Sequence, residues 1–194
     1  PGRHDLWPGY EGVFIRRHPH AGARDEADVG HEALNGLFGL VPPWSPDIRM
    51  TRFTYNARSE TVASKPSFRD AWRNAQHCII PADVIFEPDW RSGQAVPACI
   101  AREDGAPMGI AGLWSKWQSP KGESVYSYTM LTINANHHPL MRLFHKPSED
   151  KRMVLVLPPA RYGAWLDADA GRSASFLQAG ADHAVLALVP PTGT

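Results

Sequence analysis

Residues 78–133 read CIIPADVIFEPDWRSGQAVPACIAREDGAPMGIAGLWSKWQSPKGESVYSYTMLTI. Short apolar runs alternate here with proline, glycine, aspartate and serine, a pattern typical of strands joined by turns. The expected strands cover residues 78–80, 84–86, 96–101, 108–114 and 125–133. Because these strands follow one another without a long helix between them, we predict a largely antiparallel sheet system.

The flanking sequence adds further strands and a few helices. Strands are expected at residues 13–15, 37–40, 153–157 and 184–189, with a long surface loop over residues 19–35. Pro66 is predicted to open a helix with Ser67 as its N-cap, and further helices are expected over residues 139–144 and 158–166. Strands and separate helices together predict the α+β class.

Length and composition bound the organisation of the chain. With 194 residues, 43% of them hydrophobic and 21% charged, the chain is long enough to bury one hydrophobic core, and we expect a single domain over residues 1–194. No apolar stretch is long enough to span a membrane and no secretory leader is recognisable, so a cytoplasmic, nucleoid-associated location is expected. Cys78 and Cys99 lie in apolar segments and are predicted to be small buried hydrophobes in a reducing compartment.

Charge is informative only locally, because 20 Lys and Arg residues balance 20 Asp and Glu residues. Residues 49–73 carry six basic and two acidic side chains, interleaved with Phe53, Tyr55, Phe68 and Trp72. This mixture suits a surface that binds phosphates and stacks bases. The alternative is a solvated helix face beside ordinary core aromatics.

Three polar islands stand in otherwise apolar sequence: NARSE at residues 56–60, FEP at 86–88 and FHK at 144–146. They supply an amide from Asn56, a carboxylate from Glu87 and an imidazole from His145, the groups of an acid/base site acting on a carbonyl. Taken singly, each has a plainer interpretation as a turn residue, a solvated strand end or a helix C-cap.

Histidine pairs at positions 18 and 20 and at 137 and 138 invite a metal interpretation. Metal centres need three or four convergent ligands, and neighbouring side chains on a strand or turn point apart. We therefore expect neither a metal nor a cofactor.

The motifs NARSET (residues 56–61), KPSFR (65–69), CIIPAD (78–83), FE (86–87), GLW (112–114) and LFH (143–145) together resemble the SRAP family, the SOS response-associated peptidases or abasic-site processing proteins. The resemblance implies a curled, bifurcated, mostly antiparallel sheet that forms a pseudo-barrel with a few flanking helices. It also implies a monomer that binds abasic sites in single-stranded DNA and links to them through an N-terminal cysteine, with lyase-type chemistry and a role in the damage response.

The same resemblance assigns roles to residues of this sequence. Asn56 would position the terminal amine and the sugar, Glu87 would act as general acid and base with a pKa raised by burial, and His145 would protonate the ring oxygen. The implied DNA contacts are Trp44, Arg58, Thr132 and Arg152.

One departure from the family pattern concerns the nucleophile. The family begins Met-Cys-Gly-Arg, whereas this sequence begins Pro1-Gly2-Arg3 and has no cysteine before Cys78. Only three residues separate Arg3 from Trp7, where the family has some tens, so we expect the nucleophile-bearing segment to lie upstream of Pro1. If Pro1 were the true start, its secondary amine could form an iminium ion, but no thiol could close a thiazolidine ring.

Two other functions remain open at this stage. One is a thiol peptidase, acting on itself or on other proteins, in which Glu87 and His145 assist the thiol. The other is a non-catalytic module that binds single-stranded DNA, for which binding would depend on salt but not on an abasic sugar.

Overall fold

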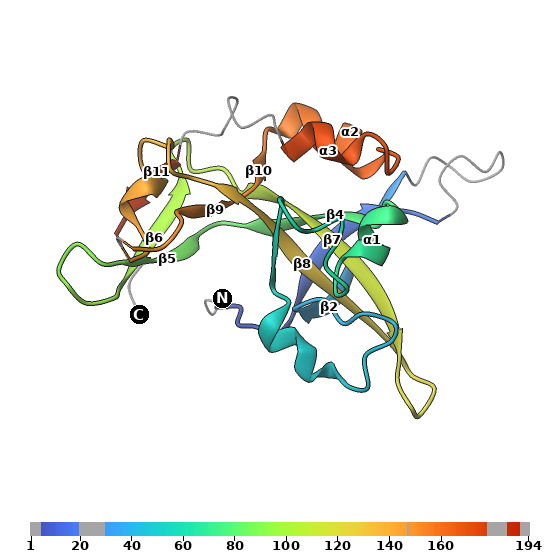
Figure 1. Ribbon diagram of the computed structural model, residues 1–194. Coiled ribbons are helices and arrows are strands. Elements are labelled where there is room, and N and C mark those ends of the chain that lie inside the picture. The colour runs from blue at the N-terminus through green and yellow to red at the C-terminus, as the bar shows by residue number, and fades with distance from the viewer. Residues whose placement is uncertain (1–4, 20–29, 147, 178–185, 191–194) are drawn as a thin grey trace.

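The computed structural model describes residues 5–19, 30–146, 148–177 and 186–190, and it confirms the α+β class (Figure 1). The larger sheet has eight strands: β1 (Glu11–Arg17), β2 (His31–Phe38), β3 (Asn56–Arg58), β4 (His77–Ala82), β7 (Met108–Gln118), β8 (Ser124–Asn134), β9 (Arg152–Val154) and β10 (Val156–Leu157). A second sheet has three strands: β5 (Ile85–Asp89), β6 (Val96–Arg102) and β11 (Leu186–Val189).

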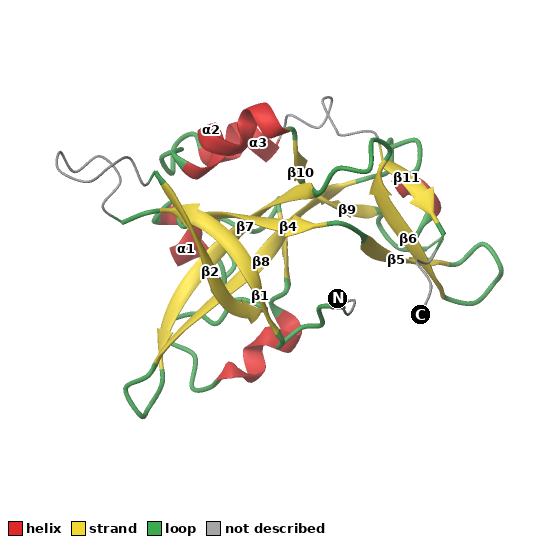
Figure 2. Cartoon of the chain, turned by 180° about the vertical axis from the view of Figure 1, so that it is seen from behind, coloured by secondary structure: helices red, strands yellow, loops and turns green. Residues whose placement is uncertain are grey.

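Five strands of the larger sheet close into a barrel. The order β7-β4-β1-β2-β8 is completed by direct pairing of β7 with β8, so the ring has no free edge. Most pairs are antiparallel, but β2 and β3 both run parallel to β8. The smaller sheet extends from one side of this barrel, as Figure 2 shows, so the expected bifurcated pseudo-barrel is confirmed.

Aromatic side chains fill the barrel. The ring of Tyr128 lies 5.4 Å from the ring of Phe14 and 5.7 Å from that of Phe38, and all three side chains are buried. Gly112 allows β7 to approach β8 closely, because a Cβ there would lie 2.4 Å from the carbonyl oxygen of Thr129. The barrel is therefore a packed core and not a channel.

The helices are short. They are the 3₁₀ helices Ile48–Phe53, Met141–Leu143 and Pro159–Arg161, and the α-helices α1 (Arg69–Arg73), α2 (Tyr162–Leu166) and α3 (Ser173–Leu177). Helices α2 and α3 cover one side of the barrel, where the indole of Trp165 donates to the carbonyl of Cys78 over 2.9 Å. Within the described residues, no helix is both long and apolar enough to cross a bilayer.

Several expected boundaries were wrong. Strand β2 starts at His31, so the loop expected over residues 19–35 ends earlier. The polar start of β2, residues 31–35, pairs with residues 13–17 of β1 and is partly exposed to solvent, so it contains no long apolar run that would indicate a strand. The strand expected over residues 153–157 is divided at Leu155, whose N–H bonds to β8 and whose carbonyl bonds to β7. The chain thus changes neighbours at this residue.

The helix expectations also needed correction. Helix α1 spans only five residues, and its N-cap is Phe68, without a side-chain bond, instead of Ser67. The helix expected over residues 139–144 is the three-residue 3₁₀ helix that ends at Leu143. The final expected strand is observed as β11, while its first residues, 184 and 185, lie outside the described part of the chain.

Candidate active site

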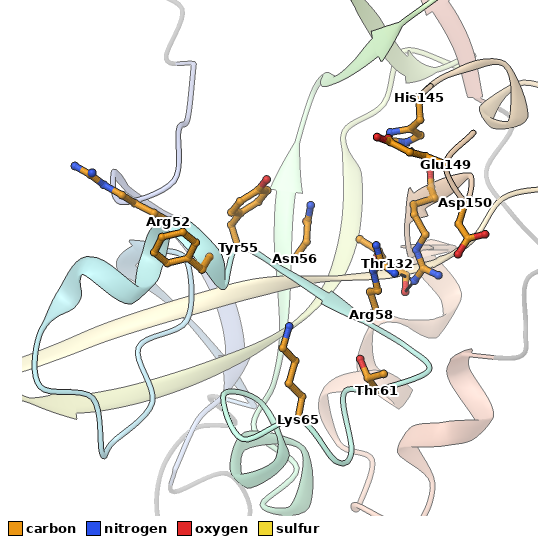
Figure 3. A pocket seen from close by; sticks show the side chains of 12 residues that line it. Arg52, Tyr55, Asn56, Arg58, Thr61, Lys65, Thr132, His145, Glu149 and Asp150 are labelled. Carbon is orange, nitrogen blue, oxygen red and sulfur yellow. Dashed lines mark hydrogen bonds between the residues drawn. The ribbon is translucent and has the colours of Figure 1, made fainter. Parts of the chain in front are cut away.

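An open pocket of about 520 Å³ lies where β3, β8 and β9 meet the segments that follow the first two 3₁₀ helices (Figure 3). It is lined by Arg52, Phe53, Tyr55, Asn56, Arg58, Thr61, Lys65, Thr132, His145, Glu149, Asp150 and Arg152. Four of these side chains are basic and two are acidic, so the lining has a net positive charge. Such a pocket suits an anionic ligand.

Strand β3 brings Asn56 and Arg58 to the pocket. Successive side chains of a strand point to opposite faces, and Ala57 between them is fully buried in the core. Parallel pairing with β8 places Arg58 beside Thr132. The alternation in NAR therefore divides the motif into one core residue and two pocket residues, which are visible in Figure 3.

Arg152 connects segments that line this pocket through hydrogen bonds from its guanidinium group. Its Nη2 donates to the carbonyl and the hydroxyl of Thr132 over 2.7 and 3.2 Å, and its Nη1 donates to Glu60 Oε1 over 2.7 Å. The hydrogen bond from Arg152 is the main cause that lowers the pKa of the Glu60 carboxyl group. The guanidinium group thus joins β8 and β9 to the turn that follows β3, and its expected contact with DNA stays a prediction.

His145 is held by its backbone and by its ring. Its backbone N–H donates to the carbonyl of Pro88 over 2.9 Å, which places the turn after the second 3₁₀ helix beside β5. Its Nε2 lies 3.1 Å from the carbonyl oxygen of Arg152 and 3.2 Å from Glu87 Oε2. Because a carbonyl only accepts hydrogen bonds, Nε2 carries a hydrogen.

Glu87 is the buried acid of the site. Its side chain is only 13% exposed, and burial raises its pKa from 4.5 to about 7. A carboxyl group that titrates near neutral pH can both donate and accept protons there. With His145 in contact, the pair forms an acid/base unit at the edge of the pocket, and the expected rise in pKa is confirmed.

Comparison with known proteins agrees with this fold. The sequence profile of the family described as "SOS response associated peptidase (SRAP)" matches residues 2–189. The chain belongs to the SRAP family. A crystal structure of a protein from Bordetella bronchiseptica has 47% sequence identity and a TM-score of 0.79, and the match covers 95% of this chain and 86% of that one.

Curated relatives of this SRAP chain are named abasic site processing proteins. YoqW from Bacillus subtilis is 34% identical over 133 residues, which cover 67% of this chain and 55% of the relative. HMCES from Gallus gallus is 29% identical over 147 residues, which cover 64% of this chain and 43% of the relative. The chain thus spans about half the length of the curated relatives it matches.

The structure brings together most of the site residues expected from the SRAP motifs. Asn56, Arg58, Thr132, His145 and Arg152 line the pocket, as the resemblance implies. Glu87 joins them through its contact with His145.

Trp44 is 52% exposed but is not among the lining residues described for this pocket. The aromatic side chains at the pocket are instead Phe53 and Tyr55, from the basic and aromatic stretch. Glu149 and Asp150 also line it, and no pattern in the sequence indicated them.

The thiols of this SRAP chain lie elsewhere. Cys78 and Cys99 are both buried, as expected, and burial raises the pKa of the Cys78 thiol. Within the described residues, no thiol lines the pocket, and no group of three or more His, Cys, Asp or Glu side chains is placed to hold a metal ion.

Proposed function

We propose that this pocket processes abasic sites in DNA. The observation that carries the proposal is the contact of 3.2 Å between Glu87 and His145 at the edge of a basic pocket that also holds Asn56. YoqW, whose match covers 67% of this chain, is named for this activity.

The chemistry follows from the substrate. An abasic deoxyribose opens to an aldehyde at C1′; a neutral amine adds to that carbon, and loss of water gives a Schiff base. Glu87 accepts the proton that the amine loses and supplies a proton to the departing hydroxyl group, for which a pKa of about 7 is suited. His145 assists opening of the sugar ring, and the Asn56 amide orients the sugar.

The attacking amine is part of the same proposal. We infer an N-terminal cysteine upstream of Pro1, as the family resemblance implies, whose amine forms the Schiff base and whose thiol then closes a thiazolidine ring. The product is a covalent cross-link between protein and DNA. If the Schiff base instead loses the C2′ proton, the C3′–O bond breaks and the strand is cut.

Single-stranded DNA is the substrate form that the pocket favours. Arg52, Arg58 and Lys65 offer positive charge to the phosphates. Phe53 is 76% exposed and Tyr55 lies two residues further, so unpaired bases can stack beside the abasic sugar. The same proposal has the protein act as a monomer on nucleoid DNA in the cytoplasm.

The decisive experiment compares two single-stranded oligonucleotides, one with a single uracil removed by a glycosylase and one intact. The 194-residue chain and a longer chain that begins Met-Cys-Gly-Arg upstream of Pro1 are each incubated with both strands. We expect both proteins to bind the abasic strand more tightly than the intact strand. A denaturant-resistant band is expected from the extended chain.

The variants Glu87→Gln and His145→Gln are expected to slow cross-linking or cleavage at least 100-fold, while Glu103→Gln, in an exposed turn, is a matched control. Equal binding of the two strands without any covalent or cleaved product would instead indicate the non-catalytic binding module. Cys78 and Cys99 are buried, so neither of these two thiols is placed to act as the nucleophile of a thiol peptidase.

A further inference from the structure

His145 has an unusual backbone conformation. Its φ is 62°, in the left-handed region that residues other than glycine rarely occupy. Such a conformation persists only where several surrounding contacts enforce it, and it is found preferentially at functional sites. The contacts that enforce it here are therefore part of how the imidazole is aimed.

Lys151 supplies one of these contacts. Its ammonium group donates to the carbonyl oxygen of His145 over 3.0 Å and to that of Lys146 over 2.8 Å. Hydrogen bonds from a charged donor are shorter and stronger than neutral ones. One side chain thus fixes two successive carbonyl groups at the turn that carries the imidazole.

Lys151 is itself anchored. Its backbone N–H donates to Asn136 Oδ1 over 3.2 Å, and its carbonyl accepts from the N–H of Ala135 over 2.8 Å. The residues after β8 therefore fix the position from which the lysine side chain reaches back. The next residue, Arg152, offers its carbonyl to His145 Nε2.

We propose that Lys151 is a positioning residue that holds the His145 imidazole against Glu87. The backbone and the ring of His145 are held by two consecutive residues, by the Lys151 side chain at one end and by the Arg152 carbonyl at the other. Loss of the lysine contact lets the turn relax and takes Nε2 away from Glu87. A displacement of about 1 Å of a catalytic group can slow a reaction about 100-fold.

The test uses Lys151→Met, which keeps the length of the side chain but removes the donor, and Lys151→Arg, which keeps charge and donors. In protein labelled with ¹⁵N-histidine, the His145 ring is expected to carry its hydrogen on Nε2 in the wild type and in Lys151→Arg. In Lys151→Met we expect exchange between the two neutral tautomers. Lys121→Met, in the exposed turn between β7 and β8, is the matched control and should resemble the wild type.

Kinetics give a second measurement, which rests on the proposed function. On abasic single strands under single-turnover conditions, we expect Lys151→Met to lower the maximal rate of cross-linking or cleavage between about 10- and 100-fold, with the half-saturating DNA concentration within twofold, and Lys151→Arg to restore most of the rate. An unchanged His145 tautomer together with a maximal rate within twofold of wild type in Lys151→Met would overturn the proposal. If the wild type itself does not act on abasic strands, the proposed function fails, and the tautomer comparison still decides the role of Lys151.

Discussion

Glu87 is kept in surroundings that disfavour its charge, and this has a consequence for stability. In the unfolded chain it titrates near 4.5, and in the folded protein near 7. The folded state therefore binds more protons at Glu87 between these values, so the contribution of Glu87 to stability is complete below pH 4.5 and is lost as pH rises through 7. A neutral side chain at position 87 should therefore recover the free energy of unfolding that is lost when Glu87 ionises.

We predict that Glu87→Gln unfolds at higher urea concentration than the wild type at pH 8. The expected gain is about 1 to 3 kcal/mol, and it should shrink towards zero near pH 4.5. Glu103→Gln, which changes an exposed turn, should show no such dependence on pH. A Glu87→Gln variant that is less stable than the wild type at pH 8 would mean that the carboxylate is stabilised in the fold.

Under the proposed function, two aromatic side chains are candidates to stack on a DNA base. The family resemblance indicates Trp44, whereas the pocket presents Phe53. We predict that Phe53→Ala weakens binding to single strands by about 1 to 3 kcal/mol, the usual value for one stacked base. Trp44→Ala should cost clearly less in the same fluorescence anisotropy titration. The reverse order would place the strand over the loop that holds Trp44.

At the scale of elements, the end of α1 offers a simple test. Asn74 is the C-cap, and Ala75 follows it with a φ of 50°, at the position where glycine most often ends a helix. The left-handed conformation costs an alanine about 1 to 2 kcal/mol relative to glycine. Glycine also raises the conformational entropy of the unfolded chain, which offsets part of the gain in stability. Ala75→Gly should therefore stabilise the protein by about 0.5 to 1 kcal/mol.

Thermal unfolding measures this gain. Ala63→Gly, in an exposed turn without a left-handed φ, is the control and should be neutral or slightly destabilising. Equal effects of the two substitutions would show that the conformation of Ala75 stores no strain.

The sequence predicts the strands of this protein better than its helices, for a physical reason. Strands such as β4 and β7 are buried, so their apolar runs are visible without knowledge of their partners. Helix α1 is too short to be stable by itself and exists because Ala71 and Trp72 pack on the core. Its bounds are set by tertiary contacts, which no local pattern contains.

At the scale of the whole molecule, the site is assembled from segments far apart in the chain. The motifs predict the chemical types of Asn56, Glu87 and His145; Asn56 and His145 line the same pocket, and Glu87 contacts His145. The orientation of Arg152 could not be predicted, because its partners Thr132 and Glu60 become neighbours only when β3, β8 and β9 pair. Pairing of β3 and β9 with β8 therefore decides which charges remain available to a ligand.

Two buried ionisable groups, Glu87 and His77, have pKa values shifted in opposite directions. His77 is buried between the barrel and helices α2 and α3, where its Nε2 lies 2.9 Å from Ser173 Oγ and its ring lies 4.0 Å from that of Trp165. Burial lowers its pKa from 6.5 to about 4. Its contribution to stability is therefore complete above pH 6.5 and is lost as pH falls towards 4, the opposite of Glu87.

Both shifts correspond to about 3 kcal/mol and fall in nearly the same range of pH, so in the wild type they should largely cancel between pH 5 and 7. In Glu87→Gln the pH dependence of His77 is no longer opposed, so the stability of this variant should fall on acidification across this range. In His77→Leu the pH dependence of Glu87 is no longer opposed, so the stability of that variant should rise on acidification. Urea unfolding of both variants and of the double variant at several pH values measures this, with the double variant expected to be as flat as the wild type. Parallel curves for all four proteins would mean that neither group titrates with a shifted pKa.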